Sequence, residues 1–290
     1  LFAPFLSAGF YYKTFMGPMR STSFWMFFEH FIRKAAGLGT ASRAPDPDSY
    51  DIAYGFCDVL VVGAGPSGLH AAAELAEQGR KVILVEQDFD AGGSYLSSGR
   101  PEDLALRDKL IRRLKAAGGQ LMLRSTAFGI YDGLVTGVIE RLTDHITDPD
   151  PHCPREVTHI LHPRHIVLAT GASERGLAFG NNDRPGVMLA GALRSYACRY
   201  GVMAGGSAVL ATCHDGTYED AIILAGLGME ITLIDARNRK SRQYQAAIAA
   251  GITVLNGKVP VNVAGSSAVA VIEVADIDEK GVVDKVTTLI

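Results

Sequence analysis

The segment Cys57–Gly68, which reads CDVLVVGAGPSG, constrains the fold of this chain more than any other feature. Its apolar residues predict a short buried strand that leads directly into three glycines, Gly63, Gly65 and Gly68. Residues 69–78 then have the composition of a helix. A strand, a Gly-x-Gly-x-x-Gly turn and a helix in this order are typical of the turn that binds dinucleotides.

Each glycine of this turn has its own physical task. Gly63 permits the tight turn, Gly65 lets the backbone approach a pyrophosphate, and Gly68 lets the helix lie close to its strand. The helix then directs free N–H groups and the positive end of its dipole at the phosphates. We therefore expect dinucleotide contacts along the whole loop, namely Gly63, Ala64, Gly65, Pro66, Ser67 and Gly68.

A second strand and an acidic residue support this interpretation. Lys81–Glu86 reads KVILVE, and Glu86 lies 21 residues after Gly65. An acid that binds a ribose hydroxyl is expected at a spacing of about 20 residues. Asp88 and Asp90 follow and should repel a 2′-phosphate. The pattern therefore favours an adenosine that lacks this phosphate.

Composition limits the class of protein. A net charge of −3 gives no reason to expect a nucleic-acid partner or an acidic membrane surface. The four cysteines are far apart and form no C-x-x-C pair, which argues against a disulfide framework and favours a reducing, cytoplasmic location. The apolar N-terminus is interrupted by Lys13, so it is too short to span a membrane. Because the chain starts with Leu inside an apolar stretch, we expect a fragment.

Gly- and Pro-rich breaks divide the chain into three parts. We expect an aromatic segment and linker at 1–56, with the linker over 37–56, a dinucleotide-binding domain at 57–178, and a second domain at 179–290. The repeated β-α-β order predicts an α/β, doubly wound Rossmann-like domain. Its closing strand should return after residue 290. Further elements are expected as a helix at Pro101–Ala117 and strands at Gln120–Ser125, Leu134–Leu142, Arg155–Leu161 and His165–Thr170.

The second domain repeats the β-α-β order but has a different loop. Strands at Ser207–Ala211 and Met229–Asp235 flank a helix at Tyr218–Gly226. The connecting loop reads TCHDG, so it lacks the glycines of a phosphate loop, and Asp215 would repel phosphates. We therefore expect a second Rossmann-like domain that is truncated and has a degenerate nucleotide loop.

Several longer motifs resemble one known family. They are AGFYYKTFM, FIRKAAGLG, CDVLVVGAGPSGL, RSTAFGIYD and VLATGASERGLAFGNNDRPGVMLAGALRSYACRYGV. Together they resemble the α subunit of heterotetrameric sarcosine oxidase, from residue 1 to about residue 240, and Gly180–Met188 is specific well beyond the glycine loop. The family's α subunit is much longer, with a ferredoxin-like region before this part and a folate-binding, aminomethyltransferase-like region after it.

The resemblance implies a chemistry and a set of partners. In that family a small amine, sarcosine, is oxidised at flavins (FMN and FAD) associated with the β subunit and the α–β interface. The remaining partners are the γ and δ subunits. The α subunit's own Rossmann site holds NAD. The family's motifs and the glycine pairs can be matched to positions in this sequence. They imply that the contacts beyond the loop are Glu86, Gln87, Asp88, Gly93, Ser94, Thr126, Ala127 and Gly171.

The residues alone do not distinguish FAD from NAD as the cofactor. Gly92–Gly93 after the acid and the triplet Ala169–Gly171 are shared with flavoproteins that bind two dinucleotides, which favours FAD. FAD and NAD present the same ADP half to such a loop. We rank NAD above FAD because of the resemblance.

Other candidate sites are weaker. His152, Cys153, His159, His162 and His165 have no recognised ligand spacing, so no metal site is predicted. Glu174 and Arg175 are expected to form an ion pair near the cofactor, and the Phe/Tyr/Met cluster at 2–28 to form core or a subunit interface. No residue set is predicted to be catalytic.

The sequence is consistent with three alternative functions. It is either the α-subunit portion of a sarcosine oxidase complex, a stand-alone FAD-dependent NAD(P)H oxidoreductase, or a non-catalytic nucleotide-binding scaffold. The missing C-x-x-C pair and the degenerate second loop count against the second alternative.

Overall fold

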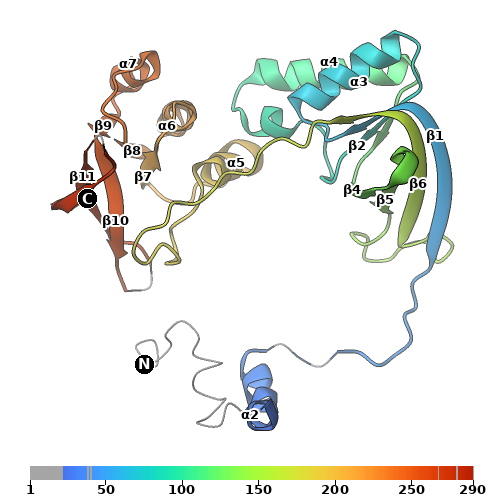
Figure 1. The fold of residues 1–290 in the computed structure, drawn as a ribbon, viewed down its shortest axis with the longest axis horizontal. Coiled ribbons are helices and arrows are strands. Elements are labelled where there is room, and N and C mark those ends of the chain that lie inside the picture. Colours follow the sequence, from blue (N-terminus) through green and yellow to red (C-terminus); the bar gives the residue numbers. More distant parts are fainter. Residues whose placement is uncertain (1–21, 38, 40, 267, 279, 290) are drawn as a thin grey trace. The chain divides into compact units, whose positions relative to one another are not determined.

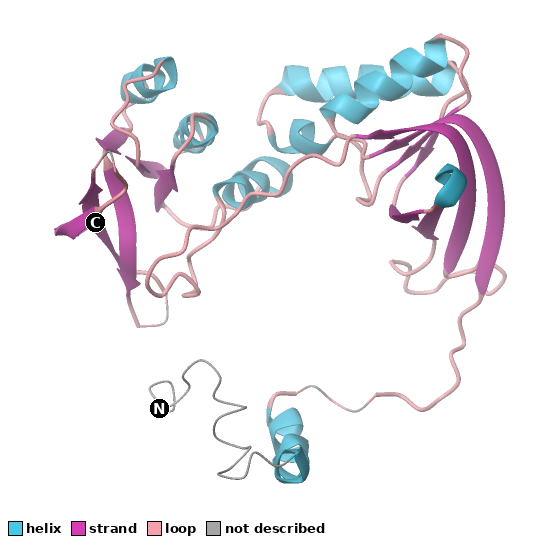
Figure 2. Ribbon diagram, viewed as in Figure 1, coloured by secondary structure: helices cyan, strands magenta, loops and turns pink. Residues whose placement is uncertain are grey.

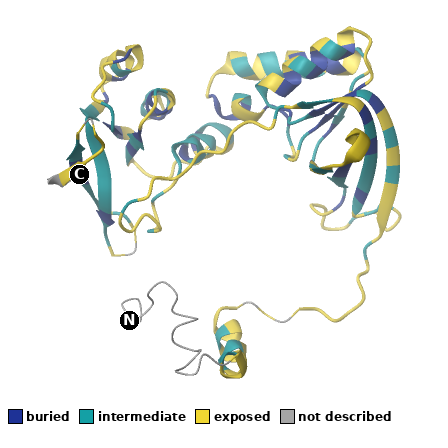
Figure 3. Ribbon diagram, viewed as in Figure 1, coloured by how far each residue is buried: buried dark blue, intermediate teal, exposed yellow. Residues whose placement is uncertain are grey.

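The computed structural model describes residues 22–37, 39, 41–266, 268–278 and 280–289. The chain divides into an N-terminal unit, Leu1–Asp48, and a main unit, Ser49–Ile290 (Figure 1). In the N-terminal unit, helix α2 (Thr22–Ala35) buries none of its residues, and Phe24, Phe27 and Phe31 are exposed (Figure 3). Most of the aromatic cluster expected at 2–28 lies outside the described residues.

The first half of the main unit is built on one sheet with helices beside it (Figure 2). The sheet has six strands in the order β3-β2-β1-β6-β5-β4. Strands β1, β2, β3 and β6 pair in parallel, and β4 and β5 are antiparallel. We call residues 50–168 the first Rossmann region. Its elements are β1 (Tyr50–Val62), α3 (Pro66–Glu77), β2 (Val82–Val85), the 3-10 helix η2 (Gly93–Ser97), α4 (Pro101–Ala116), β3 (Gln120–Met122), β4 (Ser125–Ile130), the 3-10 turn η3 (Asp132–Leu134), β5 (Thr136–Arg141) and β6 (Glu156–Leu168).

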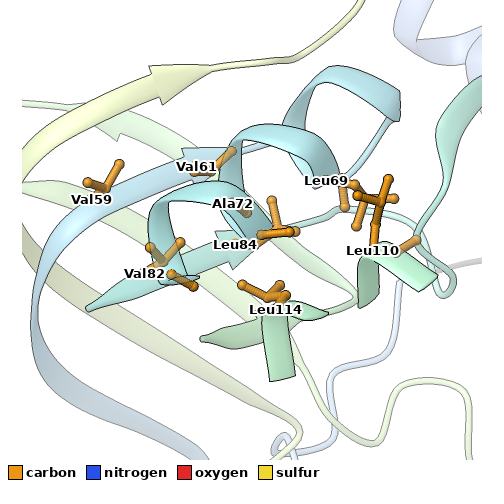
Figure 4. Packing of buried hydrophobic residues seen from close by; sticks show 12 residues of the cluster. Val59, Val61, Leu69, Ala72, Val82, Leu84, Leu110 and Leu114 are labelled. Atoms are coloured by element: carbon orange, nitrogen blue, oxygen red, sulfur yellow. The ribbon is translucent and has the colours of Figure 1, made fainter. Parts of the chain in front are cut away.

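The two faces of this sheet bury different partners. Alternate side chains such as Val61 and Leu84 pack with α3 and α4, where Leu69 and Leu114 are fully buried (Figure 4). Each fully buried aliphatic side chain contributes about 2 kcal/mol to folding. On the opposite face lie Leu60, Ile83, Val85, Met122, Val138 and Leu161. Val138 of antiparallel β5 therefore joins the core on the face that α3 and α4 leave free.

Strand β1 begins earlier than the sequence predicted. Residues 50–56, expected to end a linker, instead pair in parallel with β6, and the expected linker is wrong for this stretch. At Asp58 and Val59 both backbone N–H groups donate to the Lys81 carbonyl, at 2.8 and 3.2 Å. The register with β6 is the same on both sides of this point, since Cys57 pairs with Pro163 and Val59 pairs with His165, so the ladder is irregular there without an extra residue in β1.

Two other strand predictions also need correction. The single strand expected at Gln120–Ser125 is two short strands, β3 and β4, separated where Arg124 has a positive φ of 50°. The two strands expected at Arg155–Leu161 and His165–Thr170 are one continuous strand, β6. Pro163 has no N–H to donate to the ladder, yet β6 continues through it, with Pro163 paired beside Cys57 of β1.

The second half repeats the parallel order on a smaller scale. Strands β7, β8 and β9 form a three-stranded parallel sheet, and β10, β11 and β12 form an antiparallel one. We call residues 190–256 the second Rossmann region. The elements are α5 (Ala190–Tyr200), β7 (Ser207–Thr212), α6 (Gly216–Gly226), β8 (Glu230–Asp235), α7 (Arg242–Ala249), β9 (Thr253–Asn256), β10 (Lys258–Ala264), β11 (Val271–Ile277) and β12 (Val283–Leu289).

The predicted fold class is confirmed, since both regions have the parallel β-α-β order of a Rossmann-like α/β fold. The second region has its own core around Tyr218, Leu224 and Leu233, which are fully buried. The domain boundary near residue 178 and the closing strand after residue 290 stay predictions.

Candidate dinucleotide-binding site

The glycine loop follows directly from the last residue of β1. Gly63 has a φ of +98°, and a Cβ there would collide with the backbone of Ala169. A Cβ on Gly68 would collide with the carbonyl group of Gly63. Gly65 differs, because its φ is −72° and a Cβ would find only the Cα of Gly93, at 4.0 Å. The fold itself therefore requires Gly63 and Gly68, whereas Gly65 faces open space.

The start of helix α3 is available to an anion. Pro66 is the first helical residue, and the first turn contains no acid and receives no side-chain cap. The first backbone N–H groups of a helix have no partner within it, and they carry partial positive charge. Ser67 and Gly68 therefore offer N–H donors where a phosphate would lie.

A second glycine pair, Gly92 and Gly93, packs against this loop. The N–H of Gly92 donates to the Ala64 carbonyl at 2.8 Å. Gly93 has a φ of +52°, and a Cβ there would lie 2.8 Å from the Cα of Gly65. Ser94 follows in η2. The backbones at Gly65 and Gly93, which carry no side chains, thus lie close together where a pyrophosphate is expected.

Glu86 lies at the end of β2, beside the loop. Its Oε2 accepts a hydrogen bond from the Ala64 N–H at 2.7 Å, and its Oε1 accepts one from the Asp88 N–H at 3.0 Å. Both bonds fix the carboxylate at the C-terminal edge of the parallel strands. This is the position from which an acid can accept hydrogen bonds from ribose hydroxyl groups.

An open pocket of about 620 Å³ adjoins the segment that follows Glu86. Three of its lining residues were predicted contacts, Gln87, Asp88 and Thr126, and the other three are Ile139, Arg141 and Glu156. Of these, Arg141 on β5 and Glu156 on β6 are directly paired, which the sequence does not reveal without the strand register. Ala127, also predicted, packs its side chain against the core on the far face of the sheet.

The acidic charges near the pocket are compensated. Asp88 pairs with Arg199 through two hydrogen bonds, at 2.6 and 3.1 Å, and Asp90 pairs with Arg107 at 2.9 Å. Burial acts to raise the pKa of Asp88, but the hydrogen bond and charge of Arg199 outweigh it and hold that pKa below its usual value. The expected repulsion of a 2′-phosphate by Asp88 and Asp90 is therefore weakened.

The end of β6 completes the edge of the sheet. Gly171 has a φ of +73° and no neighbouring atom within 4 Å of a built Cβ. Glu174 does not take the ion-pair role expected with Arg175. Its Oε2 accepts a hydrogen bond from the Gly191 N–H at 2.9 Å, so it caps the start of α5.

The corresponding position of the second Rossmann region is filled by its own side chains. Asp235 is fully buried at the end of β8 and accepts hydrogen bonds from the Tyr218 hydroxyl, at 2.7 Å, and from the Arg237 guanidinium, at 2.8 and 3.0 Å. Arg237 also donates to Asp215 at 2.7 Å. The acid at the strand end is thus already paired with a cation. We call Asp215, Tyr218, Asp235 and Arg237 the buried ionic network, because Tyr218 and Asp235 are fully buried, while Asp215 and Arg237 are partly exposed.

The histidine and cysteine candidates form no cluster. Within the described part of the chain, no group of three or more His, Cys, Asp or Glu residues is placed to hold a metal ion. His159 lies 2.7 Å from Glu140, and His162 stacks on Phe56. All four cysteines are free, and burial raises the pKa of the Cys57 thiol to about 11.

Comparison with known proteins agrees with this geometry. Residues 58–170 match a family described as FAD dependent oxidoreductases. The chain is 41% identical to the sarcosine oxidase subunit alpha of Rhizobium meliloti (strain 1021) over 94% of its length, and 40% identical to that of Corynebacterium sp. (strain P-1) over 84%. The chain matches a fragment of the sarcosine oxidase α subunit. It spans only 28% and 27% of the length of these two relatives.

The structure of thioredoxin reductase from Lactococcus lactis is similar in fold, with a TM-score of 0.57. It is 20% identical, and the match covers 79% of this chain and 73% of that one. At this identity the likeness supports the fold alone. In the described part of the chain, no helix has both the length and the apolarity needed to cross a membrane.

Proposed function

We propose that this chain is the dinucleotide-binding part of a sarcosine oxidase-type α subunit, and that its first Rossmann region binds NAD. The observation that carries the proposal is the identity of about 40% to sarcosine oxidase α subunits across most of the chain. The complete protein would oxidise the N-methyl group of sarcosine in a cytoplasmic complex with β, γ and δ subunits, with transfer of the methyl carbon to folate.

The residues present fit the ADP half of a dinucleotide. Gly65 and Gly93 leave a backbone cradle that a Cβ on either would narrow, and the α3 N-terminus adds N–H donors for the pyrophosphate. Glu86 would accept the ribose hydroxyl groups, and Gln87, Asp88 and Thr126 would line the adenosine side. Ala64, Pro66, Ser67, Gly68, Ser94 and Gly171 would complete the contacts.

FAD at the same site is the alternative cofactor. It is favoured by the match of residues 58–170 to FAD dependent oxidoreductases. The two cofactors share the ADP half, so the residues above would serve either one. A stand-alone NAD(P)H oxidoreductase would in addition need a second dinucleotide site, and the buried ionic network fills that position in the second Rossmann region.

The activity assay separates the proposed functions. We expect the chain supplied with FAD, FMN and NAD to release no peroxide from sarcosine, because an amine must lie beside a held flavin ring and the described site addresses the ADP half. The complete α subunit combined with the β, γ and δ subunits should oxidise sarcosine and release peroxide. Turnover by the 290-residue chain alone, at the rate of the complex, would contradict the subunit proposal.

Cofactor specificity provides a test of Glu86. Glu86→Gln should weaken NAD binding by about 1–3 kcal/mol, because a charge-assisted hydrogen bond to the ribose is lost. Calorimetric titration with NAD and NADP measures the effect, and Glu74→Gln on the exposed side of α3 is the control. Tighter binding of NADP than of NAD by the unaltered chain would show that Glu86 does not have this role.

A further inference from the structure

Helix α5 belongs to the core of the second Rossmann region. Leu193 and Ala197 are buried there with Leu210 and Tyr218. Arg194 of the same helix adds an ion pair to Asp220 on α6, at 2.6 Å. The helix is therefore anchored on the second region, and its last turn is held in a defined position.

The last turn of α5 reaches the nucleotide side of the first Rossmann region. The Arg199 guanidinium binds both carboxylate oxygens of Asp88, and it also lies 4.8 Å from the ring centre of Phe89. A cation in the last turn of a helix is further stabilised by the helix dipole. One side chain thus contacts two consecutive residues that follow the ribose-binding acid.

The segment that Arg199 contacts is also held from β4 and β5, where the Ser125 N–H donates to the Glu86 carbonyl at 2.8 Å and the Arg141 guanidinium donates to the Gln87 carbonyl at 3.1 Å. On its other side the Arg124 N–H donates to the Asp88 carbonyl at 2.9 Å, and the Arg124 guanidinium lies 5.8 Å from the Phe89 ring centre. The Asp88 N–H donates to Glu86, whose other oxygen binds the Ala64 N–H of the glycine loop. The chain of contacts runs from α5 through Asp88 and Glu86 to the loop.

We propose that Arg199 is a positioning residue of the dinucleotide site: it holds residues 87–89 so that the Glu86 carboxylate stays oriented at the glycine loop. This inference rests on the proposed function. Arg199 need not touch the dinucleotide, since it acts through Asp88. The second Rossmann region, whose own nucleotide position is filled, thereby takes part in binding at the first.

A bidentate ion pair explains why the residue is an arginine. The planar guanidinium matches the two carboxylate oxygens and can stack on an aromatic ring, and a lysine ammonium does neither as well. Arg199→Lys should therefore retain only part of the effect, whereas Arg199→Gln should lose it.

The test combines binding with hydrogen exchange in the full chain. For Arg199→Gln we expect NAD to bind roughly tenfold more weakly, the scale of an energetic coupling between contacting residues. Arg199→Lys should be intermediate, and Arg239→Gln, which removes a charge from an exposed position, should match the unaltered chain. Exchange of the amides in residues 86–90 should be faster in Arg199→Gln without any ligand, and exchange in β8 should be unchanged.

A double-mutant cycle tests whether Arg199 acts on the dinucleotide site through Asp88. If Arg199 acts through Asp88, then Asp88→Asn combined with Arg199→Gln should bind NAD no more weakly than the poorer single variant. Native NAD affinity in Arg199→Gln, or additive losses in the double variant, would overturn the inference alone. Absence of dinucleotide binding by the unaltered chain would overturn the proposed function and the inference with it.

Discussion

Gly65→Val should abolish dinucleotide binding and leave the fold intact. The backbone of Gly65 has a φ of −72°, which any residue adopts, and a Cβ there has its nearest neighbour at 4.0 Å. The added Cβ would therefore not strain the protein. It would occupy the space in which the pyrophosphate must approach the backbone.

Gly68→Val is the informative comparison for this experiment. Its Cβ would collide with the carbonyl group of Gly63, so this variant should lose stability whether or not a ligand is present. Circular dichroism measures the fold and calorimetry measures NAD binding. A Gly65→Val chain that folds normally and binds NAD with native affinity would contradict the assignment of the loop.

Arg237→Met should destabilise the second Rossmann region by about 3 kcal/mol. The substitution leaves the fully buried carboxylate of Asp235 without its cation, which is far more costly than the loss of an exposed ion pair. The only tryptophan, Trp25, lies in the N-terminal unit, so hydrogen exchange in β7 and β8 is the suitable measurement. Arg239→Met, two residues along the chain and exposed, is the matched control.

The effect of this substitution should depend on pH. Burial acts to raise the pKa of Asp235, but hydrogen bonds from Arg237 and Tyr218 outweigh it and hold the pKa below its ordinary value of 3.8. A lowered pKa means that the ionised group stabilises the fold above pH 3.8 and that this contribution is lost as the pH falls through the folded value. The difference between Arg237→Met and the unaltered chain should shrink on acidification. Equal stability of both chains at neutral pH would show that the buried ionic network does not stabilise this region.

The sequence predicts those parts of the fold where local pattern and tertiary structure agree. The glycine loop, β2 with its terminal acid, and helix α4 appear close to their predicted positions, because glycine spacing and apolar runs are local signals. Residues 50–56 were missed although Tyr50, Ile52, Tyr54 and Phe56 alternate with other residues as in a strand. The Pro- and Asp-rich stretch just before them suggested a linker instead.

Long-range contacts account for the remaining differences. No local pattern indicates that Asp88 is neutralised by Arg199, since 111 positions separate the two residues. The same holds for Arg141 and Glu156, which line the pocket because β5 and β6 pair in one particular register. Strand β6 also continues through Pro163, which has no N–H for the ladder, at the point where β1 is irregular. Such features depend on strand register and on contacts between distant elements, which one sequence does not specify.

The most direct test is a calorimetric titration of the chain with NAD, FAD and NADP. The account predicts one NAD site per chain, because only the first Rossmann region has an open glycine loop, with weaker binding of NADP and no retained flavin. Gly65→Val should remove that site, and Arg237→Met should add none. Tightly bound FAD in stoichiometric amount with no NAD binding, or two dinucleotides per chain, would contradict the account.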